Sequence, residues 1–586
     1  MSAPGRQPAP THRGLVVALV LAIYAALSVA GYWQAWTQGA SAHALSPGGD
    51  QATSMWFLTW VAYAVVHLHN PFVSSFGNYP YGVNTMVNGQ PLPLDLLVTP
   101  VTLLAGPVVS YNLIGTLSPF ASAAAAFFLV RRFVTWQPAA FVGGLLYGFS
   151  PYVVGQGVGH IFLEFVALPP LIFMVVHDLV VRQPDRPVAR GLLLGLLAAL
   201  QLTVSAEVLL STAIMALGGV IALAVVGHRH WRDHLRFAAV GGGTALVSGA
   251  VLMAYPLWMM FRGPAHVVGP VQTSPGIYRA DLLGTVWPDD LQRFAPHAFV
   301  QVADKFAGNG SENGSYLGLP LVLLLVIAVI ALWRNRTVAV AAVLAVLAWL
   351  VSLGSHLTVH NKVTGILLPE ALYDKIPVLK NAIPVRYSLY VDLFAALILA
   401  IAVDKLRRAA LWKGNRWMSV CAPLVIGLGV LVPLVPAWPY TMVPTGTPSY
   451  FTTGAAGAIP RGSVALVYPF PDALFADPQL WQADTFLRFK SPGGRFNVPQ
   501  PPTNMSVPSR MSLTDTILSE LSDGQPVPED PALRQQLVDQ WHSWKVTTVV
   551  AVPGGQDFAQ ALSYLSWVLG SAPASSSGVD VWYHWH

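Results

Sequence analysis

Cysteine and charge are the two features this sequence has least of. Cys421 is the only cysteine among 586 residues, so no disulfide can form within the chain. Charged residues make up only 10% of the sequence, whereas soluble domains contain about 25%. Disordered chains need more charge, and collagen and coiled coils need repeats that this sequence does not have. These absences exclude a disulfide-stapled ectodomain, a disordered chain and a fibrous protein.

Apolar residues are in excess. They form 54% of the sequence, and the mean hydropathy is +0.54. A soluble enzyme of this length could not bury so much apolar surface, so the composition predicts a polytopic membrane protein. The pI near 9.2 does not indicate a nucleic-acid partner, because most basic residues lie in loops that flank apolar runs.

Apolar runs of about 20 residues are long enough to cross a bilayer. We identify about eleven, several of them short and interrupted by glycine or proline, which polytopic bundles tolerate. A further short or re-entrant segment could precede Tyr111. The predicted spans are Gly14–Trp36, Tyr111–Val130, Pro138–Tyr152, Ile161–Val181, Gly191–Ser205, Val208–Gly227, Phe237–Met260, Tyr316–Trp333, Thr337–Leu353, Tyr387–Val403 and Trp417–Pro436.

Basic residues concentrate in every other connection between these spans. Arginine pairs and clusters follow the second, fourth, sixth and eighth spans, and a larger group follows the tenth. The positive-inside rule therefore places the N-terminus in the cytoplasm, and an odd number of spans places the C-terminus outside. The long connections 43–107, 262–315 and 354–386 are then outer loops of a plasma-membrane protein.

The last 150 residues differ from the rest, because residues 437–586 are net acidic whereas residues 1–436 are net basic. We predict a transmembrane domain over 1–436 and a small extracytoplasmic α/β domain over 437–586. Apolar runs rich in β-branched and aromatic residues predict strands, and two segments have helical spacing. The Pro-, Gly- and Asn-rich stretch Ser491–Ser509 is a long loop of the kind that often serves as a lid or binding loop. The strands are Val464–Tyr468, Val546–Val552 and Val579–Tyr583, and the helices are Pro531–Trp544 and Gln556–Leu569.

The first outer loop holds the most informative pattern. A turn, Ser46-Pro47-Gly48-Gly49, leads to Asp50, and an aromatic segment that contains Trp56 and Trp60 follows. We interpret this segment as a helix lying in the membrane interface with its tryptophans at headgroup level. Asn70-Pro71 ends it, and the turn Tyr79-Pro80-Tyr81-Gly82-Val83-Asn84 comes next.

This order of motifs resembles the GT-C membrane glycosyltransferases, in particular their large, mostly uncharacterised bacterial branch. The resemblance is loose over most of the membrane part and most specific over Gly14–Tyr111. It implies a polyprenyl-phosphate-linked sugar donor, a glycan or lipid acceptor on the outer face, and Asp50 as the catalytic base. Better-known members have a pair of acidic residues at this point. Because one carboxylate is a poor divalent site, we expect no metal or other cofactor, although a metal is possible.

General chemistry supports the same role for Asp50. Glycosyl transfer needs a base for the acceptor hydroxyl and stabilisation of the departing phosphate. A carboxylate at the membrane surface meets the first need, although Gly-Gly-Asp by itself is also the pattern of an ordinary solvated turn. An inverting transfer would need only this one carboxylate, because a polyprenyl phosphate is already a good leaving group.

Other polar residues at predicted outer span ends are candidate substrate contacts, each with a structural alternative. They would bind donor or acceptor hydroxyls, or the lipid phosphate in the case of the basic residues, because arginine suits bidentate phosphate contact. The alternatives are interface anchors, a snorkelling glutamate and a helix N-terminal acid. Asp289-Asp290 is interpreted as a solvated pair rather than a metal or sugar contact. The candidates are Tyr79, Asn84, His160, Glu164, Glu207, Lys380 and Arg386.

About eleven spans would also suit a lipid or solute transporter. Transporters usually carry ionisable groups near the bilayer midplane and contain structural repeats. Here the ionisable groups gather at the outer ends, and no repeat is visible. A non-catalytic scaffold would not need Asp50. The sequence therefore favours a glycosyltransferase, with membrane lipid and a lipid-linked sugar as partners.

Overall fold

The computed structural model describes residues 10–45, 49–226, 231–269, 271, 275–376, 379–412, 416–509 and 511–585. The predicted turn at Ser46-Pro47-Gly48 therefore lies outside the described residues. The chain forms two compact units. The first comprises residues 1–34, 115–253 and 272–441, and the second comprises 35–114, 254–271 and 442–586. The last segment of the second unit begins close to the boundary predicted after residue 436.

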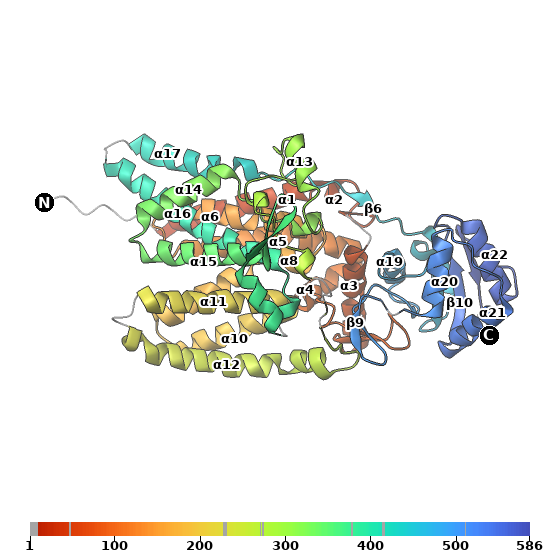
Figure 1. Cartoon of the computed structure of the whole chain (residues 1–586). Helices are drawn as coiled ribbons and strands as arrows, with labels where there is room; N and C mark the ends of the chain where they lie inside the picture. Colours follow the sequence, from red (N-terminus) through yellow and green to blue (C-terminus); the bar gives the residue numbers. More distant parts are fainter. Residues whose placement is uncertain are drawn as a thin grey trace. The chain divides into compact units, whose positions relative to one another are not determined.

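The first unit is a helical bundle (Figure 1). Its core is centred on α16, which packs against α6, α14, α15 and α17 and buries one continuous apolar cluster. Helices with all or most of their residues in this unit are α1 (Pro10–Gly31), α5 (Pro107–Val130), α6 (Gln137–Gly148), α7 (Pro151–Gly157), α8 (Ile161–Glu164), α9 (Leu168–His177), α10 (Pro187–Val204), α11 (Ala206–Val226), α12 (Trp231–Arg262), α13 (His297–Ala303), α14 (Leu319–Leu332), α15 (Arg336–Ser352), α16 (Ser388–Trp412) and α17 (Arg416–Gly429).

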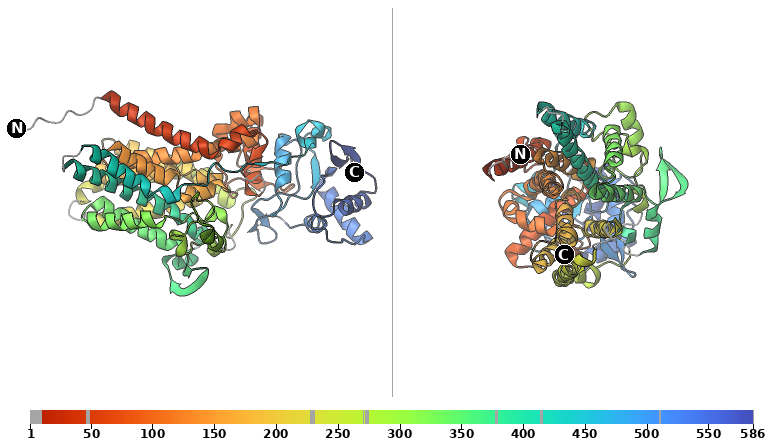
Figure 2. Two further views of the ribbon diagram at one scale, coloured as in Figure 1. Left: turned by 90° about the horizontal axis from the view of Figure 1, so that it is seen from above. Right: turned by 90° about the vertical axis from the view of Figure 1, so that its left-hand side faces the viewer.

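Short strands and turns lie in the connections between the helices of the bundle. A β-hairpin, β4 (His356–Val359) and β5 (Lys362–Leu367), stands out from the helices of the first unit in both views of Figure 2. The turns η4 (Gly310–Glu312), η6 (Leu379–Asn381) and η7 (Pro384–Tyr387) lie in the two long connections that precede α14 and α16. These turns place polar side chains at the beginning of α16.

Six helices among the described residues are long and apolar enough to cross a membrane, so the chain is a multi-pass membrane protein. Several predicted spans are interrupted. Over Pro138–Tyr152, α6 ends at Gly148 and α7 begins at Pro151, and over Ile161–Val181 the break falls between α8 and α9. Proline favours the first turn of a new helix and disfavours the interior of an old one. The six spans are Gly14–Gly31, Pro107–Val130, Ile161–Arg182, Pro187–Val204, Ala206–Val225 and Leu235–Arg262, and Ile161–Arg182 contains α8, α9 and the break between them.

The second unit joins the C-terminal residues to residues 35–114, which include the predicted first outer loop. Its main sheet has the order β11-β12-β10-β7, with β7 parallel to β10 and the other pairs antiparallel. The unit contains α2 (Trp33–Thr37), α3 (Asp50–His67), α4 (Leu92–Ala105), α18 (Ser449–Thr452), α19 (Asp477–Asp484), α20 (Leu513–Ser522), α21 (Pro531–Ser543), α22 (Phe558–Leu569), β1 (His43–Ala44), β2 (Val73–Ser74), β3 (Val83–Asn84), β6 (Val443–Pro444), β7 (Val464–Tyr468), β8 (Val498–Gln500), β9 (Met505–Val507), β10 (Val546–Ala551), β11 (Ala574–Ser576) and β12 (Val579–Trp582).

Local sequence explains the helices beside this sheet. Ser512 caps α20, Asp530 with the following proline starts α21, and Asp557 caps α22, in each case through a side-chain oxygen that accepts a backbone N–H. Helices α20, α21 and α22 lie together beside β10 (Figure 1). The predicted strands and helices of this region are present as β7, β10, β12, α21 and α22, and Trp541 is fully buried in the core.

Candidate functional site

Asp50 is the first residue of α3. Gly49 precedes it with φ +61°, a left-handed conformation that favours glycine and turns the chain into the helix. The Asp50 side chain is 43% exposed. A carboxylate in the first turn of a helix is stabilised by the unpaired backbone N–H groups at that end. Asp50 is therefore an accessible acidic group in the first turn of α3.

Helix α3 itself is buried, so the predicted interfacial position of its tryptophans is wrong. Trp56 and Trp60 are 0% and 3% exposed, and α3 packs against α4 and α19. The Trp56 indole N–H donates to Oε1 of Gln482 at 2.5 Å. The sequence shows an aromatic helix beside a predicted membrane span, but it does not show that residues more than 400 positions later cover this helix.

One partner of Asp50 comes from the predicted C-terminal loop. Nε of Arg495 donates to Oδ1 of Asp50 at 2.8 Å. Nη1 of Arg495 donates to the carbonyl of Ala473, and its backbone N–H donates to Oε1 of Gln479 at 2.9 Å. Sequence reasoning missed Arg495. The only available signal was the Pro-, Gly- and Asn-rich composition of its loop, which predicted a functional segment without selecting a residue.

Asn84 and Tyr79, the predicted residues of the turn after α3, have structural contacts. Asn84 is fully buried, and its amide donates to the carbonyls of Met259 and Pro264 at 2.8 and 2.9 Å. Tyr79 packs against the apolar core of the C-terminal sheet, and Nζ of Lys490 lies 5.0 Å from the centroid of its ring. These contacts explain both side chains without a substrate.

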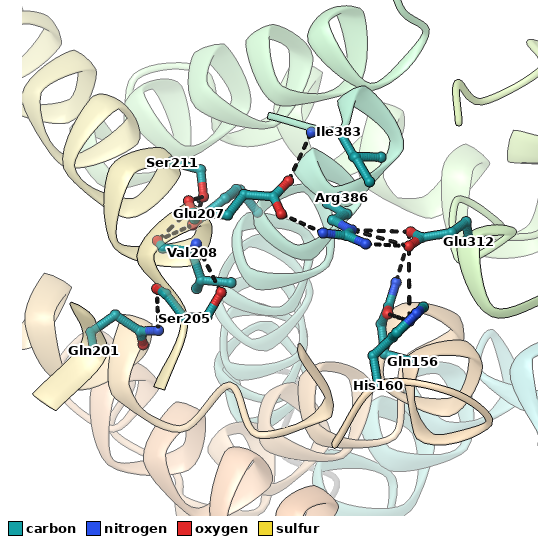
Figure 3. A network of polar contacts seen from close by, with 11 residues as sticks. Gln156, His160, Gln201, Ser205, Glu207, Val208, Ser211, Glu312, Ile383 and Arg386 are labelled. Carbon is teal, nitrogen blue, oxygen red and sulfur yellow. Dashed lines mark hydrogen bonds and ion pairs between the residues drawn. The ribbon is translucent and has the colours of Figure 1, made fainter. Parts of the chain in front are cut away.

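In the first unit, the structure brings three predicted residues together in one network, which Figure 3 shows. The Arg386 guanidinium lies between Glu207 at the start of α11 and Glu312 in η4. It donates from Nη1 to Glu207, and from Nε and Nη2 to Oε1 of Glu312 at 3.1 and 2.5 Å. Glu207 also accepts the backbone N–H of Ile383 at 2.8 Å. This network fixes the connection that leads into α16.

His160 joins the same network through Gln156. Its Nδ1 lies 2.8 Å from Oε1 of Gln156 and 3.9 Å from Oε1 of Glu312, while the Gln156 amide donates to Glu312 at 3.0 Å (Figure 3). Sequence reasoning did not select Gln156 or Glu312, although Glu312 is the only acidic residue in its Gly-, Asn- and Ser-rich stretch.

The ion pairs of this network determine the pKa of Glu312 and the charge that a ligand would meet at Arg386. Burial by itself would raise the pKa of Glu312, but the adjacent Arg386 guanidinium outweighs burial and lowers the pKa below its ordinary value. Two carboxylates surround one guanidinium, so the charge of Arg386 is balanced inside the cluster. An approaching phosphate would therefore meet a guanidinium whose charge is already compensated.

The remaining predicted contacts lie apart from this network. Glu164 is completely buried, and the Tyr32 hydroxyl donates to its Oε1 at 2.8 Å. The prediction that its side chain faces an open cavity is therefore wrong, because Tyr32, the residue directly after α1, supplies a buried partner. Lys380, in η6, is exposed.

The carboxylates of the long loop before α14 do not form the solvated pair that was predicted. Asp290 is exposed, but Asp289 is 6% exposed and accepts the backbone N–H of Leu291 at 3.0 Å. Burial raises the pKa of Asp289 to about 7. Within the described part of the chain, no group of three or more His, Cys, Asp or Glu side chains is arranged to hold a metal ion.

Similar folds occur among membrane glycosyltransferases. The cryo-EM structure of arabinofuranosyltransferase AftD from Mycobacteria matches 97% of this chain with a TM-score of 0.54 and 14% identity. This chain spans about 40% of the length of that enzyme. The likeness confirms the predicted GT-C resemblance at the level of the fold.

Two further structures match at lower TM-scores. An oligosaccharyltransferase from Archaeoglobus fulgidus gives 0.45, with 13% identity over 95% of this chain and 71% of the other. ArnT from Cupriavidus metallidurans gives 0.43, with 11% identity over 97% of each chain.

Sequence comparison gives the family. No curated protein matches the chain. Residues 14–412, about two thirds of the sequence, match the family described as a domain of unknown function, DUF6311. The matched range covers α1 to α16 and therefore includes both Asp50 and the Arg386 network. The chain accordingly belongs to the DUF6311 family.

Proposed function

We propose that the protein is a membrane glycosyltransferase that transfers a sugar from a polyprenyl-phosphate donor to a glycan or lipid acceptor of the cell envelope on the outer face. The fold shared with the mycobacterial arabinofuranosyltransferase supports this class of reaction. One observation carries the assignment of the site. Asp50 is a half-exposed carboxylate at the N-terminus of a helix in which the next residues, Gln51 to Ala62, are all buried. Such a group is held in place and remains accessible to substrate.

Asp50 is the general base in this proposal. The acceptor hydroxyl has a pKa far above 7, so it needs a positioned carboxylate to take its proton as it attacks the anomeric carbon. The C–O bond to the phosphate breaks as the new glycosidic bond forms, and the polyprenyl phosphate leaves as a stable anion. This single displacement inverts the anomeric centre and needs only one carboxylate, so no resident metal is part of the proposal.

The proposed membrane topology is based on the distribution of basic residues between the predicted spans. The N-terminus is cytoplasmic, about eleven segments cross the plasma membrane, and the 437–586 domain is extracytoplasmic. The six long apolar helices, with shorter apolar helices that include α14, α15 and α17, support a multi-pass arrangement. Arg6 and Lys413, two of the residues that set the predicted orientation, lie outside the described residues.

The side chains proposed as substrate contacts differ in how exposed they are. Lys380 is exposed and is free to approach a lipid phosphate at the membrane surface. His160 is partly buried and lies at the edge of its network, where its ring can contact a sugar hydroxyl. Glu164, Glu207 and Asn84 bond inside the protein, so any substrate contact by them needs those bonds to break. Binding of phosphate by Arg386 remains a prediction.

An Asp50→Asn variant tests the proposed function. It keeps the shape of the side chain and removes the base, so turnover should fall about 10²–10⁴-fold. Purified protein would be assayed with undecaprenyl-phosphate-linked pentoses and hexoses and a panel of envelope glycans. Protein yield and binding of undecaprenyl phosphate should stay near wild type, because Asp50 is not in the core.

The matched control is Asp539→Asn, which removes the same charge from an exposed position on α21. This variant should transfer sugar at the wild-type rate. Transfer by Asp50→Asn at the wild-type rate would remove Asp50 from the mechanism, and Glu164 would be the next carboxylate to test.

A further inference from the structure

The C-terminal segment from Phe489 to Asn497 is built into the structure around α3. The backbone N–H of Ser491 donates to the carbonyl of Phe76 at 2.8 Å, and the N–H of Tyr79 donates to the carbonyl of Ser491 at 2.9 Å. Because backbone bonds run in both directions, the segment and the turn after α3 hold each other in register.

Side chains fix the end of the same segment. Asn88 and Asn497 exchange two bonds, from the Asn497 N–H to the Asn88 side chain at 2.7 Å and from the Asn88 amide to the Asn497 carbonyl at 3.2 Å. The Phe496 ring lies 4.9 Å from that of Trp56, between centroids. A Cβ on Gly77 would lie 2.6 Å from the Phe496 ring, so only glycine allows this approach.

Arg495 lies in this anchored segment and bonds to Asp50. Its backbone is held on both sides, because its N–H donates to Gln479 and its carbonyl accepts the Thr53 hydroxyl at 3.3 Å. Its guanidinium is held by the Ala473 carbonyl and donates from Nε to Asp50 at 2.8 Å. The direction of the Nε–H is thus set by contacts that do not involve Asp50.

We infer that Arg495 is a positioning residue for Asp50, and that the C-terminal segment is thereby part of the catalytic site. This inference rests on the proposed function. The side chains of Arg495 and Asp50 are 32% and 43% exposed, and an ion pair so open to water adds little to stability. Its physical effect is to restrict the rotamers of Asp50, so that the carboxylate meets the acceptor hydroxyl in one orientation. Misplacing a catalytic group by about 1 Å can cost about 100-fold in rate.

Kinetics of Arg495→Gln, Arg495→Lys and their combinations with Asp50→Asn test the inference. The substrates would be undecaprenyl-phosphate-linked sugars, and binding would be measured with undecaprenyl phosphate alone. Arg495→Gln should lower kcat about 10–100-fold and change the KM of the donor less than about 2-fold. Arg495→Lys, which keeps the charge, should recover part of the loss. Arg461→Gln, at an exposed position before β7, is the matched control and should behave as wild type.

The double variant separates positioning from a general structural effect. If Arg495 acts through Asp50, adding Arg495→Gln to Asp50→Asn should change the residual rate less than about 2-fold. Equal losses in both backgrounds would overturn the inference, as would an Arg495→Gln variant that raises the donor KM with kcat unchanged. A wild-type rate for Arg495→Gln beside an inactive Asp50→Asn would overturn the inference alone. A wild-type rate for Asp50→Asn would overturn the proposed role of the base as well.

Discussion

Replacement of Arg386 by methionine tests whether this residue holds the protein together or binds the donor. The side chains of Arg386 and Glu312 are 14% and 2% exposed, so the pair between them is buried. Methionine has a similar length but no charge, and it would leave Glu207 and Glu312 without their cation. Breaking a buried ion pair by removing one partner costs about 3–5 kcal/mol. We therefore expect Arg386→Met to unfold at a clearly lower temperature.

The pH dependence of this loss of stability follows from the pKa of Glu312, which Arg386 lowers in the folded protein. A depressed pKa contributes stability above the pKa of the unfolded state, and this contribution is lost as the pH falls through the folded-state value. In Arg386→Met the guanidinium is gone, so burial raises the pKa of Glu312 instead. Protonation of Glu312 at low pH then removes an unpaired buried charge and restores part of the stability of the variant. The stability difference between wild type and variant should therefore be larger at pH 8 than at pH 5.

The assay is thermal unfolding of purified protein in detergent at pH 5 and pH 8, together with binding of undecaprenyl phosphate. Arg293→Met is the control, because Arg293 is exposed and donates to the Trp438 carbonyl rather than to a carboxylate. Adding Glu312→Gln to Arg386→Met removes one unpaired charge and should recover part of the lost stability. An Arg386→Met variant that melts like wild type but binds undecaprenyl phosphate about tenfold more weakly would refute this reasoning and support phosphate binding.

Two other predictions concern pH and topology. Because burial raises the pKa of Asp289 to about 7, its contribution to stability is present at low pH and is lost as the pH rises from about 4 to 7. The difference from its ordinary value corresponds to about 4 kcal/mol at most. The melting temperature of Asp289→Asn should therefore change less between pH 5 and 8 than that of wild type. Asp290→Asn, which alters the exposed neighbour, should show the same change as wild type. Alkaline phosphatase should be active when fused after His586 and inactive after Arg132 or Arg408. An inactive C-terminal fusion would contradict the proposed outer position of the 437–586 domain.

Much of the local structure could be predicted, because it depends on neighbours in sequence. The strand Val464–Tyr468 was predicted with the bounds that β7 has, and the helix that follows Asp530 begins at its proline. β-branched runs and helix caps act over a few residues, so their effect is visible in the sequence. The apolar runs likewise predicted helices at the correct positions in the bundle, apart from the breaks at prolines.

The electrostatics of the candidate site could not be predicted in the same way. Arg386, Glu207 and His160 were selected as separate substrate contacts at three span ends. Tertiary structure joins Glu207 to Arg386 directly and His160 to Arg386 through Glu312, whose carboxylate compensates the charge of Arg386. A sequence gives the type of each side chain but not its partner, and here the partners lie 74 and 179 positions from Arg386.

The sequence by itself determined that this is an apolar, multi-pass chain with an isolated aspartate at the start of an aromatic helix. Composition and short-range pattern are sufficient for that, because the hydrophobic effect and helix capping act on residues wherever they occur. Only the tertiary structure decided that the helix is buried rather than interfacial, and that Arg495 holds Asp50. The two residues are 445 positions apart, and the contact exists because the C-terminal segment folds back onto α3 within the same compact unit.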